Sequence, residues 1–392
     1  MSLTSTARSR LARPLAATLA ALLALVLALT VFSPPATAAP PAPGPVFAVP
    51  GGQRTPAGTI SNGTQITDLL VRNVDGAPRG SVIRFATALT DRGLTSALIR
   101  AHRRGVHVRA VIPTHSTRGC GTSQPRRLGN AIGRNIRGKS WMKCIRGSAR
   151  NAPDAGGHMH MKVWSFSRTG GRQHVVVVTS QNATENAKQT QWNDAYQSVG
   201  WGELYHSWVS LFNELKKDAG GSFWQRSWGA SGAYATPVAA SNDPIVRRIN
   251  AIPAQGARIR VAMSAISYGN SASDRPVRIA RALIAKKRQG ADIAILYTHT
   301  LGKQAPYAVR LMRQNGIPVK AFVNDRPYVH HKFMTATYRE GGKRVYRVWT
   351  GSEEWKQSSY GQDEFVLQLA GKGTVQAYVG FWTYLRDTLA RR

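Results

Sequence analysis

The chain has 392 residues, of which 42% are hydrophobic and 18% are charged. This hydrophobic share supports a sizeable core and argues against a disordered chain. The charge is unusual, because 53 Lys and Arg face only 19 Asp and Glu and give a formal net charge of +34. Such an excess attracts polyanions, so nucleic acid, anionic lipid and wall-type phosphate polymers are candidate partners. A solvated surface that is merely rich in arginine is the alternative.

The N-terminus has the pattern of a secretory signal peptide. Three arginines between positions 8 and 13 precede an apolar run from Leu15 to Phe32, and Ala36-Thr37-Ala38 follows as an A-x-A cleavage pattern. The apolar run is long enough to stay as a membrane anchor, but the cleavage pattern and the prolines after it favour removal. The sequence therefore predicts a signal peptide over residues 1–38, a Pro/Gly-rich segment over 39–60, and a secreted, extracellular protein.

The two cysteines of the chain, Cys120 and Cys144, fit that compartment, because disulfides persist outside the cell. Two cysteines without clustered histidines make a poor zinc site. We expect a structural disulfide just upstream of the first candidate catalytic motif.

An internal repeat organises the rest of the chain. Gly80–Ala86 and Gly256–Ala262 match as G-x-x-I-R-x-A, and each is predicted to be a buried strand. A helical apolar pattern follows in both places and stops at a glycine, Gly105 or Gly290. A second strand comes next, so the sequence predicts the same β-α-β unit, with parallel strands, twice. These second strands are predicted over Val106–Ile112 and Ala291–Tyr297.

The match continues with a His-x-Lys motif at 160–162 and another at 330–332. Each is followed by a strand, a Gly-Gly hairpin turn and a returning strand that ends near a serine. We interpret the chain as a tandem duplication with lobes over 61–220 and 243–392. The linker between them, 221–242, is rich in Gly, Ala and Ser. Its aromatic residues predict either an ordered lip over the site or packing on the core; they are Phe223, Trp224 and Trp228.

The His-x-Lys spacing has a physical reason. Residues i and i+2 of a strand point to the same face, so His160 with Lys162, and His330 with Lys332, would project together. One such motif means little, but two copies at equivalent places of a repeat are a strong signal. A pseudo-two-fold pairing of the halves would bring four cationic or cationisable groups into one site.

Such a site suits a phosphodiester, because phosphoryl transfer needs charge neutralisation on the non-bridging oxygens. The two lysines could supply it, together with Ser180, Ser352 and Asn182. One histidine could act as nucleophile and the other as general acid and base. Asp194 and Asp363 would each orient one imidazole, unless they form ordinary surface salt bridges.

The paired His-x-Lys motifs, each followed by a Ser-x-Asn-like strand end and an acid, resemble the phospholipase D superfamily from about Ile66 to the C-terminus. The resemblance implies a duplicated α/β/α sandwich, with mixed sheets flanked by helices and the site between pseudo-two-fold-related lobes. It also implies a phosphohistidine intermediate without metal or cofactor, with His160 as nucleophile and His330 as general acid. Members of the family hydrolyse phospholipids, cleave nucleic acid or transfer phosphatidyl groups to alcohols.

The sequence departs from the family pattern in two ways. Ser167 and Thr337 stand where the fuller motif has Asp. Glu354 stands where Asn is usual, and a carboxylate cannot donate a hydrogen bond unless it is protonated. Glu354 is therefore protonated, or it is turned away, or the second half of the site is weakened.

Three functions stay open at this level. The first is a secreted phosphoric diester hydrolase of the phospholipase D type, acting on phospholipid at a membrane surface by hydrolysis or transfer. The second is an extracellular, metal-independent nuclease with the same chemistry, which the net charge favours. The third is a catalytically inactive module that binds phosphate polymers, which Glu354 motivates. The duplication supplies its own pseudo-dimer, so we expect a monomer without an obligate protein partner.

Overall fold

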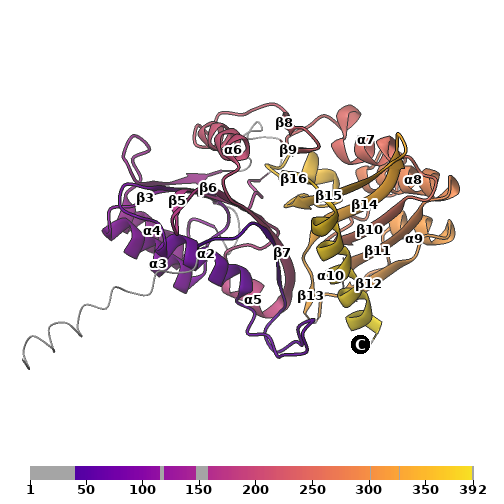
Figure 1. Cartoon of the computed structure of the whole chain (residues 1–392), viewed down its shortest axis with the longest axis horizontal. Helices are drawn as coiled ribbons and strands as arrows, with labels where there is room; N and C mark the ends of the chain where they lie inside the picture. The colour runs from indigo at the N-terminus through magenta and orange to yellow at the C-terminus, as the bar shows by residue number, and fades with distance from the viewer. Residues whose placement is uncertain (1–39, 115–118, 147–157, 301, 326, 391–392) are drawn as a thin grey trace, which may run out of the picture. The chain divides into compact units, whose positions relative to one another are not determined.

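The computed structural model describes residues 40–114, 119–146, 158–300, 302–325 and 327–390 (Figure 1). The predicted signal peptide and its cleavage site lie outside these residues. Within the described ranges, no helix combines the length and the hydropathy that crossing a bilayer requires.

The first half of the chain forms a mixed sheet around the predicted β-α-β unit. β2 (Val82–Ala86) and β3 (His107–Pro113) are parallel, and α3 (Arg92–Arg103) connects them. The strand order is β1-β7-β6-β5-β2-β3-β4, and β13 (Tyr328–Val329) from the second half of the chain pairs with β7. The other strands of this sheet are β1 (Gly44–Ala48), β4 (Trp141–Ile145), β5 (Val163–Thr169), β6 (Arg172–Thr179) and β7 (Gln191–Ser198).

Local sequence explains the ends of α3. The helix begins where the Asp91 carboxylate accepts a hydrogen bond from the Leu94 amide at 2.7 Å. The chain leaves the helix through Gly105 at φ 90°, a conformation that favours glycine. The predicted glycine stop at the end of this helix is confirmed.

The second half repeats this plan. β10 (Arg258–Met263) and β11 (Asp292–His299) are parallel and are connected by α8 (Arg275–Arg288). The strand order is β12-β11-β10-β14-β15-β16-β9-β8. The remaining strands are β12 (Val319–Val323), β14 (Lys332–Glu340), β15 (Lys343–Gly351), β16 (Phe365–Ala370), β8 (Trp224–Trp228) and β9 (Ser231–Ala235).

The two Gly-Gly turns close matching hairpins, β5–β6 and β14–β15. All four glycines have φ between 51° and 76°, the conformation that a two-residue hairpin turn needs. The predicted duplication of strand, helix, strand and hairpin is therefore present in the fold.

The region predicted as a linker, 221–242, contains the β8–β9 hairpin, which extends the second sheet at its edge. Trp224 is 4% exposed and lies in the core. The sequence predicted that the aromatic residues of this region either form a lip over the site or pack on the core. Trp224 packs on the core.

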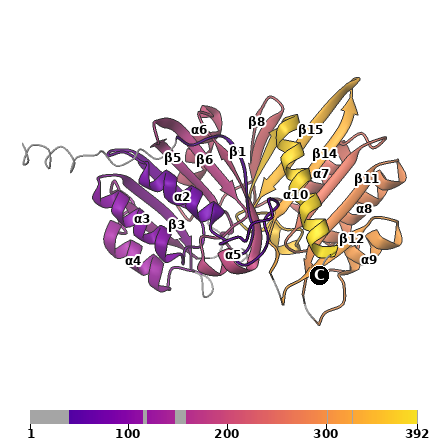
Figure 2. The same cartoon turned by 60° about the horizontal axis from the view of Figure 1, so that its bottom comes forward.

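The core has three parts. Helices α2, α3 and α4 pack on the outer face of the first sheet, and α7, α8 and α9 on the outer face of the second (Figures 1 and 2). The third part joins the inner faces of both sheets with α6 and α10, so the two halves share one hydrophobic core. The helices not bounded above are α2 (Gln65–Asp75), α4 (Ser123–Ile132), α5 (Glu185–Thr190), α6 (Gly202–Leu215), α7 (Pro244–Ala251), α9 (Tyr307–Gln314) and α10 (Lys372–Ala390).

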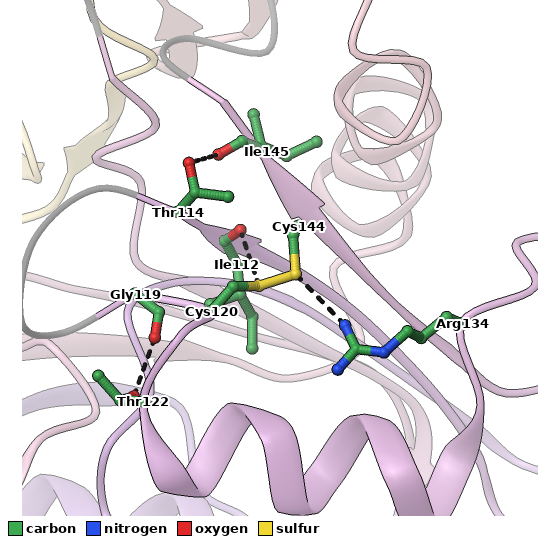
Figure 3. The surroundings of a disulfide bond; sticks show 8 residues. All are labelled: Ile112, Thr114, Gly119, Cys120, Thr122, Arg134, Cys144 and Ile145. Carbon is green, nitrogen blue, oxygen red and sulfur yellow. Dashed lines mark hydrogen bonds between the residues drawn. A yellow bond between two sulfur atoms is a disulfide. The ribbon is translucent and has the colours of Figure 1, made fainter.

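The predicted disulfide between Cys120 and Cys144 is present, with the two Cα atoms 5.9 Å apart (Figure 3). It ties the segment before α4 to β4. Its surroundings are ordered by hydrogen bonds, because Arg134 donates to the Cys144 sulfur at 3.6 Å and Thr114 donates to the Ile145 carbonyl at 3.0 Å.

Candidate active site

Each His-x-Lys motif lies at the start of a strand and is paired with the other half of the chain. The His160 amide donates to the Asp363 carbonyl, and the His330 amide donates to the Trp192 carbonyl, both at 2.9 Å. The first motif leads into β5 and the second into β14. The two motifs are therefore brought together by backbone pairing across the duplication.

The first half-site is centred on His160. Its Nδ1 donates to Oε1 of Glu364 at 2.9 Å, and the Ser352 hydroxyl donates to Oε2 of the same carboxylate at 2.5 Å. The Glu364 side chain is fully buried, whereas 17% of the His160 side chain is exposed. The carboxylate thus holds the imidazole through Nδ1 and leaves Nε2 to meet a substrate.

The second half-site has the same plan with a neutral partner. Nδ1 of His330 donates to Oδ1 of Asn193 at 2.9 Å, and the Ser180 hydroxyl donates to the same oxygen at 3.0 Å. Nζ of Lys332 lies 3.0 Å from Nε2 of this imidazole and donates to the His330 carbonyl at 2.8 Å. In the first half-site, Lys162 donates to the His160 carbonyl at 2.5 Å.

These contacts correct the predicted orienting acids. Neither Asp194 nor Asp363 holds a motif histidine, because the backbone pairing fixes the register one residue away. The Asp363 carbonyl bonds to the His160 amide, so the next residue, Glu364, faces the imidazole. In the same way, the Trp192 carbonyl bonds to the His330 amide, and Asn193 faces that ring.

Asp194 instead holds His331, the middle residue of the second motif. His331 Nδ1 donates to Oδ1 of Asp194 at 2.7 Å, and both side chains are fully buried. Tyr378 donates to the other carboxylate oxygen at 3.1 Å, as does Thr350. Burial raises the pKa of Asp194, but the contacts with His331, Thr350 and Tyr378 outweigh it and hold this pKa below its usual value. This dyad fastens β7 of one half to β15 and α10 of the other.

The hydroxyls of the two predicted serines, which were expected to meet phosphate oxygens, have other hydrogen-bond partners. Ser180 and Ser352 are buried, and their hydroxyls hold Asn193 and Glu364 rather than lying open to a phosphate oxygen. The Asn182 side chain, by contrast, makes no hydrogen bond with any residue in the described ranges. It stays a candidate for contact with substrate oxygens.

The structure decides among the three states considered for Glu354. Its carboxylate lies 2.5 Å from Nζ of Lys356 and 3.7 Å from Nζ of Lys332, and the Ser264 hydroxyl donates to it at 2.8 Å. The lysines hold the pKa of Glu354 well below its usual value although burial opposes them. Glu354 is therefore ionised and lies beside Lys332, so it offsets part of the charge that Lys332 would offer to a phosphate.

Residues 77–215 match the family model described as "Cardiolipin synthase, PLD-like domain". This match places residues 77–215 in the phospholipase D superfamily, as the sequence predicted. No curated protein matches the chain by sequence. A phosphatidylserine synthase from Haemophilus influenzae Rd KW20 is similar in fold, with a TM-score of 0.55 and 10% identity over 84% of this chain and 85% of that one. A polyphosphate kinase from Porphyromonas gingivalis has a TM-score of 0.51 and 12% identity over 86% of this chain, which spans about half (50%) of the kinase.

Burial sets the protonation of this phospholipase D-like site. It lowers the pKa of both His160 and His330 well below the usual value, and the neighbouring lysines lower it further. The imidazoles are therefore neutral near pH 7, which a histidine nucleophile requires. Burial also lowers the pKa of Lys332 to about 7 and raises the pKa of Glu364 to about 8. Two supporting groups thus titrate close to neutral pH.

Sequence reasoning missed Glu364, Asn193 and Lys356. The signal available in the sequence was a similar spacing in the two halves. Asn193 lies 13 residues after Ser180, and Glu364 lies 12 residues after Ser352. Because the supporting residues differ in type, matching identical acids paired Asp194, one residue after Asn193, with Asp363, one residue before Glu364. The repeat did not point to Lys356, because the equivalent position in the first half is Thr184. Lys356 follows Glu354, and Thr184 follows Asn182, at the same distance.

Within the described residues, no group of three His, Cys, Asp or Glu side chains could hold a metal ion. His158 lies beside the site, with its ring centroid 5.3 Å from that of His160, and Nε2 of Gln362 lies 3.1 Å from its Nδ1. The expectation of metal-free chemistry stays a prediction that a chelator can test.

Proposed function

We propose that the protein is a phosphodiesterase that hydrolyses or transfers the phosphodiester of phospholipids through a phosphohistidine intermediate. The observation that supports this proposal most is that each imidazole is held by a residue from the other half of the chain, which we call crossed support. Glu364 holds His160, and Asn193 holds His330. Each contact joins one half of the chain to the other, so both rings serve one site. Each ring is held through Nδ1, which directs Nε2 to a shared substrate.

His160 suits the role of nucleophile, because an ionised Glu364 stabilises positive charge on the imidazole. Nε2 of His160 attacks phosphorus, a P–N bond forms, and the bond from phosphorus to the leaving alcohol oxygen breaks. That oxygen takes a proton from Nε2 of His330, which must therefore be protonated when the substrate is bound; the negative charge of the phosphate would raise its pKa and favour this form. Water, or an alcohol in the transfer reaction, then gives its proton to His330 and displaces His160 from phosphorus, which completes the cycle.

The non-bridging oxygens would be met by Lys162, Lys332 and the Asn182 amide. Glu354 offsets part of this charge, and Lys356 restores it through its contact with Glu354. Preorganised donors of this kind contribute about 3 kcal/mol each to transition-state stabilisation.

Phospholipid is the favoured substrate for two reasons. The family model that matches residues 77–215 is described by a cardiolipin synthase, and a protein of similar fold is a phosphatidylserine synthase. The net charge of +34 also favours an anionic lipid surface. The same charge supports the second candidate, a metal-independent nuclease, because phosphate contacts release counterions.

The test offers the purified protein vesicles of phosphatidylcholine or phosphatidylglycerol, or plasmid DNA, with chelator present throughout. We expect head-group release that His160→Ala abolishes and that His206→Ala, an exposed histidine on α6, leaves unchanged. Cleavage of DNA without head-group release would replace the proposal with the nuclease. Binding without turnover of any of these diesters would favour the inactive module that Glu354 motivates.

We further propose that the protein acts outside the cell, supported by the N-terminal sequence pattern and by the disulfide, since disulfides persist in oxidising compartments. Mass spectrometry of protein from the culture medium should find an N-terminus just after Ala38. Retention of the whole chain in the cell fraction would contradict this.

A further inference from the structure

A second basic site lies in the first half of the chain, away from the His-x-Lys motifs. It is a pocket of about 530 Å³ between the end of α3 and the start of β3. The candidate active site lies at the other end of these strands, because β5 starts directly after Lys162 and runs antiparallel to β2. We call this the basic pocket; its charged and polar lining consists of Arg79, His102, His107, Lys139 and Ser140.

All four ionisable side chains that line the basic pocket are basic. None of them forms an ion pair with an acid in the described part of the chain. Asp75, on nearby α2, is already paired with Arg100 and Arg104 at 3.2 and 3.7 Å. Burial lowers the pKa of His107, and Lys139 and Arg109 lower it further, as expected where cations face one another without a counter-charge.

Two more cations lie near the basic pocket without lining it, since Arg109 is close enough to lower the pKa of His107 and Arg84 is its neighbour on β2. Arg84 on β2 and Arg109 on β3 are register partners, so their side chains stand side by side on one face of the sheet. Arg109 Nε donates to the Lys139 carbonyl at 3.1 Å, and Arg84 donates to the Tyr205 hydroxyl at 3.1 Å. Both acceptors are neutral, and like charges placed opposite each other on neighbouring strands are destabilising.

Two buried polar groups beside this arginine pair have no hydrogen-bond partner. Nε of Arg84 is buried without a hydrogen-bond partner, and so is the hydroxyl of Ser165, its register partner on β5. A buried donor without an acceptor costs on the order of 1–3 kcal/mol. An anion bound next to the Arg84–Arg109 pair would supply the negative charge that this part of the molecule lacks.

In two other basic pockets of the molecule, one cation has an acid partner. Arg258, in a pocket beside α10, lies 3.3 Å from Asp292. Arg248, in a pocket beside β9, lies 3.6 Å from Glu353. The basic pocket is different because not one of its four cations has an acid partner in the described residues.

We propose that the basic pocket and the Arg84–Arg109 pair form a binding site for a phosphate-type oxyanion, separate from the catalytic site. A tetrahedral oxyanion offers only acceptors, which matches a lining of donors, and arginine binds phosphate oxygens in a fork. The proposal does not require the protein to hydrolyse anything.

The test is calorimetric titration with inorganic phosphate in a phosphate-free buffer of fixed ionic strength. His107→Gln/Lys139→Gln should bind one equivalent fewer than the parent, or bind it at least tenfold more weakly. Arg344→Gln/Lys372→Gln, which removes two positive charges from the pocket beside α10, is the matched control and should bind like the parent. Equal stoichiometry and affinity in all three proteins, or an equal loss in both variants, would overturn the proposal.

Two further measurements separate this site from catalysis and folding. The basic-pocket variant should keep the parent's thermal midpoint without phosphate or raise it, because like charges have been removed. Its kcat on bis(4-nitrophenyl) phosphate should equal that of the parent. A tenfold fall in kcat with normal folding would place these residues in the catalytic machinery and overturn the proposed separation.

A vesicle arm identifies the source of the phosphate. Weaker sedimentation of the basic-pocket variant with phosphatidylglycerol vesicles, relative to the control variant, would show that the site takes phosphate on a lipid surface. Equal sedimentation together with the lost equivalent would show that it takes soluble phosphate.

Discussion

The two half-sites share one backbone plan and differ in their supporting chemistry. His160 is held by the carboxylate of Glu364, whereas His330 is held by the amide of Asn193. The middle residue of the first motif is Met161, which lies in the hydrophobic core. The middle residue of the second motif is His331, which forms a buried dyad with Asp194. The backbone is thus repeated while the charge is not, which suits a nucleophile on one side and a proton donor on the other.

The largest expected effect separates the two imidazoles. His160→Ala should lower kcat by about 10⁴-fold or more, because no covalent intermediate can form. His330→Ala should lower it to a similar degree on a poor leaving group and far less on 4-nitrophenyl esters, which leave without a proton. With these esters, His330→Ala should show a burst of 4-nitrophenol in rapid-quench kinetics, and mass spectrometry should find a phosphorylated His160 peptide. A phosphorylated His330 peptide instead would reverse the assigned roles.

A smaller effect is expected at the supporting residues. Glu364→Gln should lower kcat by about 10²-fold, because a neutral amide no longer stabilises the charged imidazole. Asn193→Asp makes the opposite exchange in the second half-site and should change kcat less than tenfold. The two variants are matched controls for each other. An equal loss in both would show that the half-sites are functionally equivalent.

The pH dependence should show both buried groups that titrate near neutrality. Lys332, with a pKa of about 7, loses its charge as the pH rises, whereas Glu364, with a pKa of about 8, becomes ionised as the pH rises. Activity that needs both charged forms is therefore bell-shaped, with a maximum midway between these values, near pH 7.5. Glu364→Gln should remove the rising limb, and a profile that is flat between pH 6 and 9 would contradict the assignment.

Glu354 should have a milder effect in the other direction. Glu354→Asn removes a carboxylate from beside Lys332 and should lower KM a few-fold below pH 7, about 1 kcal/mol of binding free energy. The charge of Glu354 raises the pKa of Lys332, so in the variant the maximum of the pH profile should move to lower pH. An unchanged KM and an unchanged maximum would mean that Lys356 alone sets the effect of Glu354.

The smallest effect on activity is expected from the disulfide. Cys120→Ser/Cys144→Ser should destabilise the fold by about 3 kcal/mol, since the loop between the cysteines is no longer closed in the unfolded chain. The bond lies outside the half-sites, so kcat below the melting transition should stay within about twofold of the parent. Thermal unfolding with matched activity assays checks both, and a large loss of kcat would connect the loop to catalysis.

Much of the fold was accessible from sequence because strand, helix and turn signals are local. The matching G-x-x-I-R-x-A strands, the glycine stop at Gly105 and the Gly-Gly hairpins each depend on a few neighbouring residues. The family resemblance then supplied the two-lobed sandwich, and both His-x-Lys motifs lie where the halves meet.

The support of the imidazoles was not accessible, because it depends on strand register between distant segments. A shift of one residue along β16 decides whether Asp363 or Glu364 faces His160, and no local pattern reports that shift. The role of Glu354 likewise depends on Lys356, whose position beside the carboxylate is set by the chain after β15.

The crossed support has a consequence for assembly. Because His160 needs Glu364 and His330 needs Asn193, neither lobe contains a complete set of contacts for its own imidazole. A lobe expressed alone could keep its sheet but would leave its histidine without a partner. We therefore expect activity only from the assembled chain, in which β13 pairs with β7 and His331 donates to Asp194.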